Sequence, residues 1–353
     1  MRSDKSSQYT EINNVDILKL DWHRHLESME STGDFELLEN FNLDSENKLE
    51  LERTKVIWIQ TIQCIGCSES LIDGAHPEFF QALQNLKIDI SYHEAFLMQQ
   101  GIFVNNKKAN TAEFNSLKLL DEITENNGYI LVVEGSIANG PHGTGKYCMI
   151  GGLTSKELFE KAARNCSVII AVGMCATYGG ISCARSDIVD LLDFRGIDFT
   201  LKDRSKGMMN ELGIDKPVIN IPGCPPHPDW MLFTLGALVS GNVKIPDDLK
   251  KVLDEYGRPK VFFPPEYTVH DDCPHIESFK RKDFSECIGE EKCLLKLGCK
   301  GPSAHADCSL RKWNNRNNYC PQAGSPCVAC VEPDFPDSAR PVYTIHGRKK
   351  KRN

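Results

Sequence analysis

Apolar and polar positions alternate in blocks between about residues 54 and 241, and this pattern indicates the local structure. Five short and almost wholly apolar runs have the character of buried strands: 56–62, 88–92, 129–133, 168–172 and 218–221. Stretches with helical spacing lie between or after them: 68–86, 112–125, 155–164, 186–194 and 230–239. Strands that alternate with helices predict an α/β domain built on a doubly wound parallel sheet.

The pattern changes after about residue 242, where the apolar runs shorten and Pro, Gly, Asn and Cys become frequent. Turn signals then outnumber periodic elements, so this part lacks the residues for a core of ordinary size. We expect metal–thiolate bonds to hold it together. The predicted division is a polar N-terminal extension (1–53), an α/β domain (54–241), a cysteine-rich domain (242–340) and a basic tail (341–353).

Composition narrows the class of protein. The chain has 353 residues, of which 41% are hydrophobic and 25% charged, as in globular proteins. Its net charge of −8 argues against nucleic acid as a partner. The longest mostly apolar stretch, 230–243, is shorter than the roughly 20 residues that a transmembrane helix needs.

The two ends of the chain bear on its location. The N-terminal residues show neither the apolar region nor the paired arginines of a signal peptide, so we expect a cytoplasmic protein. Five consecutive basic residues, 348–352, allow two interpretations. They can form a solvated tail, or they can hold the protein peripherally at an anionic membrane surface.

Fifteen cysteines are many for a cytoplasmic protein, where disulfides are rare. Metal binding or redox chemistry is therefore the better explanation. One set of four follows three predicted strands directly: Cys64, Cys67, Cys175 and Cys224. Because ligands of open α/β sheets bind beyond the carboxyl ends of the strands, these thiols should meet at one cofactor. Zinc and an iron–sulfur cluster are the two candidates, and the glycine-rich backbone around the isolated third and fourth cysteines favours the cluster.

The cysteine-rich part contains eight further candidate ligands in two sets of four. The first set is His270, Cys273, Cys293 and Cys299, and the second is Cys308, Cys320, Cys327 and Cys330. Three clusters would thus use eleven cysteines and one histidine. The remaining cysteines are Cys148, Cys166, Cys183 and Cys287. We expect Cys166 in the core, packing roles for Cys148 and Cys183, and Cys287 as the weaker alternative to Cys293.

These residues resemble the small, electron-transferring subunit of nickel–iron hydrogenases. The matching stretches occur in the family's order and run from about 55 to 336: QCIGCSES (63–70), VVEGSI (132–137), GMCATYGG (173–180), NIPGCPPHP (220–228), VHDDCP (269–274), CLLKLGCKGP (293–302) and CVACVEPDF (327–335). The resemblance implies a flavodoxin-like domain, an irregular iron–sulfur cluster domain and an obligate large subunit that holds the nickel–iron centre. The small subunit alone is not expected to be catalytic.

The resemblance also assigns the three sets. The cluster nearest the nickel–iron centre (proximal) would take the set at the strand ends, the distal cluster the set with His270, and the medial cluster the set with Cys320. Many family members have proline at the position of Cys320 and hold a 3Fe–4S medial cluster. The thiol at this position therefore predicts three 4Fe–4S clusters. A neutral imidazole in place of a thiolate should also raise the potential of the distal cluster.

The sequence departs from the family pattern near the proximal set. Gly66 and Gly180 stand where oxygen-tolerant relatives carry two additional cysteines, and Ile65 stands where threonine is common. Asp73 replaces a basic residue and could tune or ligate the proximal cluster, although a salt bridge to the large subunit is the better explanation. Glu69 could orient the subunit interface or relay protons, or simply favour a helix N-terminus. With the missing twin-arginine signal and membrane anchor, these features are closest to actinobacterial-type uptake hydrogenases.

The expected function follows from the family. Electrons from the oxidation of H₂ on the large subunit would pass through the three clusters to an acceptor, either a quinone or a carrier protein. The heterodimer is expected to form a higher oligomer. Two alternatives are weaker: an iron–sulfur subunit of a quinone-reductase-like complex, which would resemble only the first domain, and a binding module with structural zinc.

Overall fold

The computed structural model describes residues 53–75, 78–104, 107–108, 115–184 and 189–336. Five strands form one sheet: β1 (Thr54–Gln60), β2 (Ile88–His93), β5 (Ile130–Glu134), β9 (Val168–Val172) and β11 (Val218–Ile221). The order across the sheet is β2-β1-β5-β9-β11, and all neighbouring pairs are parallel. The five predicted strands are therefore confirmed. Strand order 2-1-3-4-5 is that of flavodoxin, with its switch point between β1 and β5.

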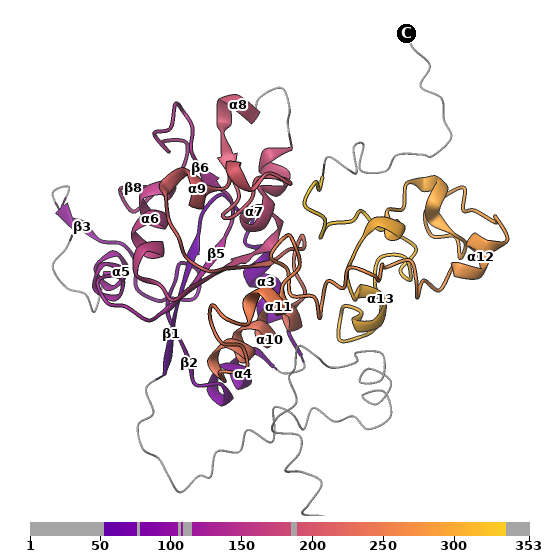
Figure 1. Ribbon diagram of the computed structural model, residues 1–353, viewed down its shortest axis with the longest axis horizontal. Coiled ribbons are helices and arrows are strands. Elements are labelled where there is room, and N and C mark those ends of the chain that lie inside the picture. The colour runs from indigo at the N-terminus through magenta and orange to yellow at the C-terminus, as the bar shows by residue number, and fades with distance from the viewer. Residues whose placement is uncertain (1–52, 76–77, 105–106, 109–114, 185–188, 337–353) are drawn as a thin grey trace, which may run out of the picture.

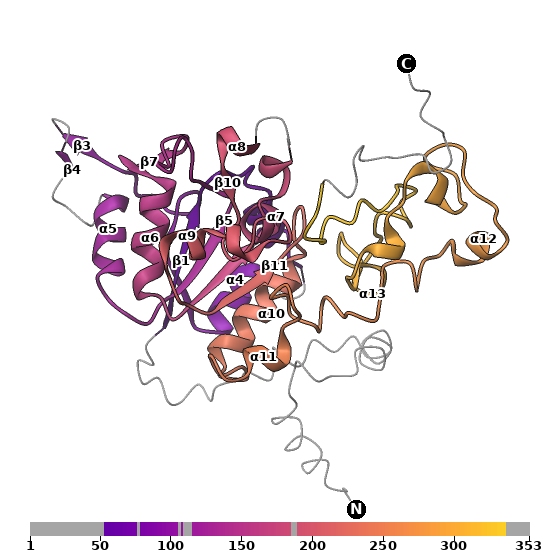
Figure 2. The ribbon, with the colours of Figure 1, turned by 45° about the horizontal axis from the view of Figure 1, so that its top comes forward.

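Helices cover both faces of this sheet (Figures 1 and 2). On one face lie α3 (Gly66–Ile72), α4 (Phe79–Asn85) and α10 (Pro228–Val239). On the other lie α5 (Ser116–Thr124), α6 (Ser155–Asn165) and α9 (Met208–Leu212). Successive strand residues point to opposite faces, so Val56 and Trp58 join the first layer while Ile57 and Ile59 join the second. The doubly wound architecture is thus confirmed.

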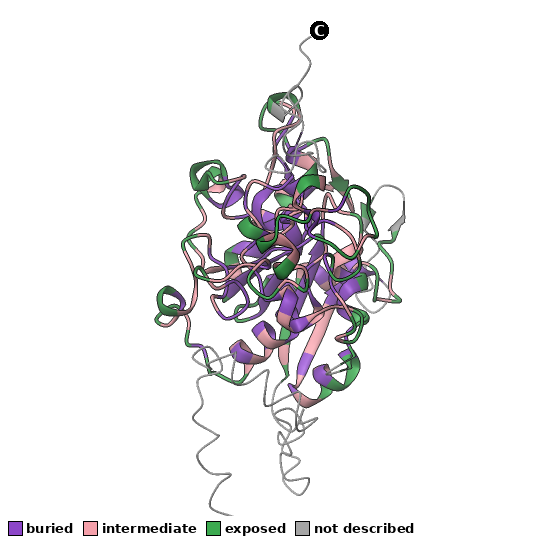
Figure 3. Ribbon diagram, turned by 90° about the vertical axis from the view of Figure 1, so that its right-hand side faces the viewer, coloured by how far each residue is buried: buried purple, intermediate pink, exposed green. Residues whose placement is uncertain are grey.

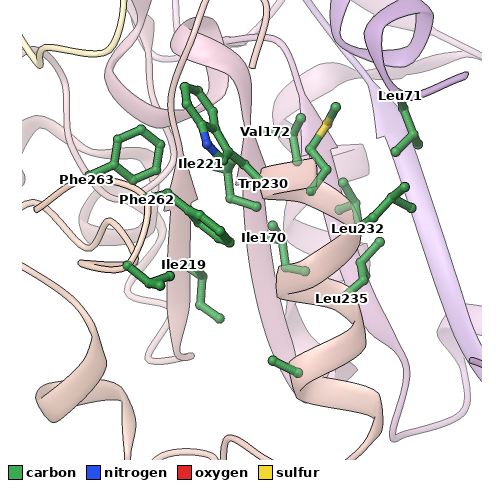
Figure 4. Close-up of a cluster of buried hydrophobic side chains, with 14 of the residues drawn as sticks. Leu71, Ile170, Val172, Ile219, Ile221, Trp230, Leu232, Leu235, Phe262 and Phe263 are labelled. Carbon is green, nitrogen blue, oxygen red and sulfur yellow. The ribbon is translucent and has the colours of Figure 1, made fainter. Parts of the chain in front are cut away.

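The layer beneath α10 continues into the C-terminal part of the chain. Figure 4 shows Trp230 of α10 beside Ile221 of the sheet and close to Phe262 and Phe263. The rings of Trp230 and Phe263 lie 4.8 Å apart, and both side chains are fully buried. One apolar cluster therefore crosses the predicted boundary at residue 241. The division into domains at that residue stays a prediction.

One predicted helix is wrong in extent, because the stretch 68–86 forms two helices. The first, α3, ends at its C-cap Asp73, and Gly74 and Pro77 follow in the sequence. Proline lacks the N–H that a continuing helix needs, and Gly is common just after a helix end. A new helix begins after Glu78, whose carboxylate accepts hydrogen bonds from the N–H groups of Phe80 and Gln81 at 3.3 and 3.1 Å.

The other helix predictions hold in part. Helix α6 begins after Thr154, which forms a capping box with Glu157. Helix α5 begins after its N-cap Asn115, and the predicted residues 112–114 lie outside the described part. Of the stretch 186–194, residues 186–188 are also outside it. The remainder gives α8 (Val189–Leu192), and Phe194 belongs to a strand.

Several short elements complete the α/β part. Strand pairs are β3 (Phe103–Val104) with β4 (Lys107–Lys108), β6 (Ile137–Ala138) with β10 (Phe194–Arg195), and β7 (Met149–Ile150) with β8 (Leu153–Thr154). Short helices are α7 (Gly173–Tyr178), η2 (Gly180–Cys183) and η3 (Arg204–Lys206). None of the helices in the described ranges is long and apolar enough to span a bilayer. The predicted N-terminal extension, apart from residue 53, and the basic tail lie outside those ranges.

The C-terminal part is irregular, as the turn-rich sequence predicts. Between 242 and 336 its helical elements are all short: α11 (Leu249–Val252), α12 (Ile276–Lys280), η4 (Leu294–Leu297), η5 (Gly301–Ser303) and α13 (Cys308–Arg311). Its β-structure within these residues is limited to isolated bridges such as Phe284 with Cys293. Figure 3 looks onto this end of the molecule, where buried segments lie among intermediate and exposed ones.

Candidate iron–sulfur cluster sites

The first set of cysteines lies at the carboxyl edge of the sheet. Cys64 and Cys67 connect β1 to the first turn of α3, Cys175 lies in α7 after β9, and Cys224 follows β11. Parallel strands bring their carboxyl ends to the same edge, so residues 160 positions apart in the sequence become neighbours. The structure therefore brings the four predicted ligands of the proximal site to one edge of the sheet.

The electrostatics of these thiols indicate that they lie close to one another. Burial raises the pKa of Cys67 well above its usual range, and the charges of Glu134, Cys175, Cys64 and Cys224 raise it further. Burial also raises the pKa of Cys175 to about 12, with contributions from Cys224 and Cys64. Four thiolates at this edge would repel one another, and metal ions that deprotonate and neutralise them would remove that repulsion.

Glycine lets the backbone approach the sulfur atoms closely. Gly173 has a φ of +81°, and a Cβ built on it would lie 2.3 Å from the sulfur of Cys67. A side chain at this position would therefore occupy the space of the thiol. Gly66, between the two cysteines of the first loop, would place a Cβ 3.3 Å from the sulfur of Cys64. The glycine-rich surroundings expected from the sequence are thus part of the site's geometry.

A buried carboxylate holds the loop that carries Cys64 and Cys67, and the sequence analysis did not identify it. Glu134 ends β5, between β1 and β9, and is fully buried. Its Oε1 accepts hydrogen bonds from the backbone N–H groups of Cys67 at 3.2 Å and Ser68 at 3.4 Å. A charged residue at the end of an otherwise apolar strand, in VVEGSI, was the available signal.

The second carboxylate oxygen of Glu134, Oε2, also accepts several hydrogen bonds. Trp58 Nε1 and Gln60 Nε2 each donate to Oε2 at 3.1 Å, and the hydroxyl of Ser68 donates to the same oxygen. Ser68 also lies 3.1 Å from Nε2 of His93, whose pKa is lowered by burial to about 4. The imidazole is therefore neutral at pH 7. This polar network fixes the first turn of α3 against β1 and β5.

The set with His270 gathers around residues 270–301. Burial raises the pKa values of Cys273 and Cys293, and both are raised further by the charge of Cys299. A Cβ on Gly301 would lie 3.5 Å from the sulfur of Cys299 and 3.7 Å from the Cβ of His270. The structure thus brings all four residues together. The half-buried imidazole of His270 packs edge-on against Phe279 at 4.6 Å.

The set with Cys320 lies between the other two. Burial raises the pKa values of Cys308 and Cys327 well above the usual range, and the charge of Cys330 raises both further. Cys320 in turn contributes to the raised pKa of Cys308 and Cys330. The charge of Cys320 thus acts on two of its three predicted partners, while Cys320 itself is affected by the charge of Cys299 of the neighbouring set.

Contacts between neighbouring residues connect the three sets in series. Cys224, in the set at the strand ends, lies close enough to Cys330 for both its backbone and its charge to affect the pKa of the Cys330 thiol. The N–H of Cys327 donates to the sulfur of Cys299 at 3.4 Å. The neighbouring N–H of Lys300 donates to the carbonyl of Cys327 at 2.7 Å. The order along these contacts is strand-end set, Cys320 set, His270 set, which is the order that the resemblance assigns.

The four remaining cysteines lie apart from the three sets. The sulfur of Cys166 is buried in the core and contacts the carbonyl of Ala163, as expected. Cys183 is also buried and donates to the carbonyl of Phe194, and the backbone carbonyl of Cys148 accepts from the N–H of Ser155 at 2.9 Å. Cys287 is exposed and bonds to Glu290, whereas Cys293 interacts with Cys299. The choice of Cys293 over Cys287 agrees with this arrangement.

Glu69 and Asp73, the two candidate tuning residues, line a cavity of about 710 Å³ beside the strand-end set. Glu69 lies in the first turn of α3 and is exposed, and Asp73 is the exposed C-cap of the same helix. His227 is the N-cap of α10. Its Nδ1 accepts from the N–H of Asp229, and its Nε2 lies 2.7 Å from the carbonyl of Lys312.

The donor set fits clusters of iron and sulfide. Each set offers four donors, all of them thiols except His270, and backbone N–H groups donate to the sulfurs of Cys299 and Cys327. Within the described ranges, no three His, Cys, Asp or Glu side chains gather as tightly as a single metal ion requires. The proposal of clusters therefore rests on donor type and on which thiols interact.

Two family models match the chain in succession. Residues 64–238 match the 20 kDa subunit of NADH ubiquinone oxidoreductase. Residues 266–343 match the C-terminal region of the small subunit of NiFe and NiFeSe hydrogenases. The first match covers only the α/β part, as expected for a quinone-reductase-like subunit, and the second covers the part with the other eight predicted ligands.

Whole-chain relatives are hydrogenase small subunits. The F420 non-reducing hydrogenase II small subunit of Methanosarcina mazei is 52% identical over 94% of this chain and 86% of its own. The periplasmic [NiFeSe] hydrogenase small subunit of Desulfomicrobium baculatum is 34% identical over 83% of this chain and 87% of its own.

Solved structures of hydrogenases are similar to this chain as well. The [NiFeSe] hydrogenase of Desulfomicrobium baculatum aligns with a TM-score of 0.71 and 33% identity over 84% of this chain and 100% of that one. An actinobacterial-type NiFe hydrogenase from Ralstonia eutropha aligns with a TM-score of 0.66 and 26% identity over 83% of each chain. With its sheet order, its three thiol sets and these relatives, the chain belongs to the family of nickel–iron hydrogenase small subunits.

Proposed function

We propose that this chain carries electrons between the nickel–iron centre of a hydrogenase large subunit and an external acceptor. The observation that supports this most strongly is the serial order of the three four-ligand sets: Cys224 lies beside Cys330, and the N–H of Cys327 donates to the sulfur of Cys299 at 3.4 Å. Iron–sulfur clusters, when bound, supply one-electron transfer at each set. The protein positions them.

The twelve predicted ligands divide as follows in this proposal. The proximal cluster takes Cys64, Cys67, Cys175 and Cys224, the medial cluster Cys308, Cys320, Cys327 and Cys330, and the distal cluster His270, Cys273, Cys293 and Cys299. The interaction of Cys320 with Cys308 and Cys330 supports a four-thiolate medial site. We therefore propose three 4Fe–4S clusters.

The large subunit is proposed to dock at the edge of the sheet where the proximal set lies. Cys64 and Cys224 are exposed there, and Glu69 and Asp73 line the adjacent cavity. Acidic side chains on an exposed helix can pair with basic side chains of a partner. We propose this role for Asp73 in preference to ligation of the proximal cluster.

The acceptor, the oligomer and the location remain proposals. The half-buried His270 marks the exit set, from which a quinone or a carrier protein would take electrons. We propose, from the family resemblance, that the heterodimer associates into a larger assembly. A cytoplasmic location is proposed from the N-terminal sequence, although the relative from Desulfomicrobium baculatum is named as periplasmic. Fractionation of the source cells, with immunodetection of this chain, would test that location.

A subunit of a quinone-reductase-like complex is the second candidate. The match of residues 64–238 to the NADH ubiquinone oxidoreductase subunit favours it. That match stops before the two sets between 270 and 330, so it leaves eight predicted ligands without a role. The hydrogenase family accounts for both parts of the chain.

The decisive experiment is purification of the complex from its source through an affinity tag on this chain. We expect a nickel-containing partner to co-purify and dye-linked oxidation of H₂ to follow it. His270→Cys should lower the potential of the distal cluster, because a thiolate adds negative charge to it. Purification without a nickel-containing partner would contradict the hydrogenase assignment. An unchanged distal potential in His270→Cys would contradict ligation by His270.

A further inference from the structure

The hydrogen bonds around Glu134 can be resolved into donors and acceptors, beginning with His93. Its Nδ1 accepts a hydrogen bond from the backbone N–H of Ala95 at 3.1 Å, so this nitrogen carries no proton. In a neutral imidazole the other nitrogen then carries the proton. Nε2 of His93 therefore donates to the hydroxyl oxygen of Ser68, 3.1 Å away. The ring is fully buried and stacks on Phe96 with the centroids 3.7 Å apart, which fixes its direction.

The hydroxyl of Ser68 is left with only one way to use its proton. A hydroxyl has one hydrogen to donate and two lone pairs to accept with. Nε2 of His93 occupies one lone pair, and Nε2 of Gln60 occupies the other at 3.0 Å. The hydroxyl proton is therefore donated to the remaining neighbour, Oε2 of Glu134. As long as both donors are present, Ser68 cannot accept a proton from Glu134.

Glu134 is surrounded by donors alone. Within the described part of the chain, Oε2 accepts from Trp58, Gln60 and the hydroxyl of Ser68, and Oε1 accepts from the backbone N–H groups of Cys67 and Ser68. A protonated carboxyl would need an acceptor for its hydrogen, and none of these groups offers one. Hydrogen bonds to the charged form of a carboxyl favour that form. The fully buried Glu134 is therefore a carboxylate, and the donors that reach it are neutral.

We propose that His93, acting through Ser68, is a positioning residue that keeps Glu134 ionised, and that this buried charge lowers the reduction potential of the proximal cluster. Oε1 of Glu134 lies 3.2 Å from the backbone nitrogen of Cys67, one of the proposed proximal ligands. Reduction adds negative charge to a cluster, and a nearby anion opposes it. Solvent screens a buried charge only weakly.

A lowered potential would favour release of the electron from the proximal cluster to the medial one. The inference rests on the proposed function, and the two can fail separately. If the wild-type complex contains no iron–sulfur cluster that couples magnetically to nickel, the proposed function fails. If it contains such a cluster and the substitutions below do not move its potential, only this inference fails.

The test is a redox titration of the intact complex, followed by EPR, in Glu134→Gln and His93→Phe. Glu134→Gln removes the charge and keeps the shape of the side chain. His93→Phe frees a lone pair of Ser68, which can then accept a proton from Glu134. We expect the proximal potential to rise in both variants and the other two potentials to stay unchanged. A tenfold change in the reduction equilibrium is expected for Glu134→Gln, which is about 59 mV for a one-electron couple.

Two matched controls separate charge from packing. His93→Gln keeps a side-chain N–H that can donate to Ser68, so it should retain the wild-type potential. Glu94→Gln replaces the half-buried acid next to His93, whose pKa is raised to about 8 by burial. Glu94 is therefore mainly neutral at pH 7, and its substitution changes little charge. A rise in Glu94→Gln equal to that in Glu134→Gln, or in His93→Gln equal to that in His93→Phe, would overturn the proposal.

The two His93 variants carry the test alone if Glu134→Gln does not assemble, because both leave Glu134 in place. An unchanged proximal potential in His93→Phe would overturn the role of His93, and an unchanged potential in Glu134→Gln would overturn the role of the charge. Infrared difference spectra between the reduced and oxidised complex give a second readout. His93→Phe should show a protonated-carboxyl band that the wild type lacks, and its absence would contradict the proposed control of ionisation.

Discussion

Gly173 shows how one residue can decide whether a cofactor fits. Its φ of +81° lies in the left-handed region, and the space of its missing Cβ is filled by the sulfur of Cys67. Glycine adopts such a φ without steric cost, whereas other residues pay about 1–2 kcal/mol. In addition, any side chain at position 173 would collide with the sulfur of Cys67, so the available space requires glycine as well as the backbone conformation.

Gly173→Ala should therefore displace Cys67 and empty the proximal site. We expect about four irons fewer per chain than in the wild type, which is one 4Fe–4S cluster, measured by iron analysis of the purified complex. Gly213→Ala is the control, because Gly213 also has a positive φ of +60° but nothing within 4 Å of its Cβ position. An unchanged iron content in Gly173→Ala would contradict the described approach of Gly173 to Cys67.

The limits of prediction from sequence are visible at single residues. The cysteines of the first set could be placed because each follows a strand, and the edge of a parallel sheet gathers strand ends. Glu134 was not identified as functional. Its partners are 66 to 76 residues away in sequence and depend on packing, which local pattern does not encode.

At the scale of elements, continuous apolar runs made the five strands predictable, since strands buried on both faces need them. The break between α3 and α4 was missed because apolar spacing continues across it, with Leu71 and Phe79 in the same core cluster. Gly74 and Pro77 were the local signal for the break. Periodicity indicates which face is buried, and it does not show whether one helix or two present that face.

A second acid, the half-buried Glu94, directly follows the last residue of β2, His93. Its Oε2 accepts from the N–H of Gln60 at 3.0 Å, while its Oε1 is buried and has no partner. Burial raises the pKa of this carboxyl to about 8. At pH 7 Glu94 is therefore mainly protonated in the folded protein and ionised in the unfolded chain.

Glu94→Gln should make stability less dependent on pH. Between about pH 4.5 and 8 the folded protein holds a proton that the unfolded chain has lost. Wild-type stability therefore falls as pH rises through this window, by at most about 1.4 kcal/mol per pH unit. Gln cannot ionise, so the difference in thermal midpoint between variant and wild type should move in favour of the variant from pH 5 to pH 8.

His93 makes stability depend on pH in the opposite direction, and it does so equally in the wild type and in Glu94→Gln. Because the pKa of His93 is lowered to about 4, the free energy of unfolding decreases as pH falls below about 6.5. In that range the unfolded chain binds a proton that the folded protein does not bind. The comparison of variant with wild type cancels this contribution. A difference in midpoint that stays constant between pH 5 and pH 8 would contradict the neutral state of Glu94.

At the scale of the molecule, buried ion pairs join the C-terminal part to the α/β part. Arg311 donates to Asp307 of its own region at 2.7 Å and to Asp229 of α10 at 2.9 Å. Trp230 Nε1 donates to the other oxygen of Asp307 at 2.9 Å. The four side chains are nearly inaccessible to water. They fix the cysteine-rich part against α10 and hence against the proximal edge of the sheet.

Arg311→Met should destabilise the molecule strongly, because it leaves Asp229 and Asp307 buried without their cation. Loss of one partner of a buried pair typically costs about 3–5 kcal/mol. Lys251→Met is the control, since the Lys251 side chain is 73% exposed and its pair with Asp248 should contribute at most about 1 kcal/mol. The shift of the thermal unfolding midpoint of the complex measures both. Equal shifts in the two variants would show that the Arg311 pairs do not join the parts.

The central claim is that three four-ligand sets hold three 4Fe–4S clusters, with Cys320 completing the medial one. Mössbauer spectroscopy of the intact ⁵⁷Fe-labelled complex tests it most directly, because each cluster type has its own spectrum. The account predicts that all iron outside the nickel–iron centre, about twelve atoms per chain, belongs to 4Fe–4S clusters. A native 3Fe–4S spectrum in the freshly isolated complex would contradict it.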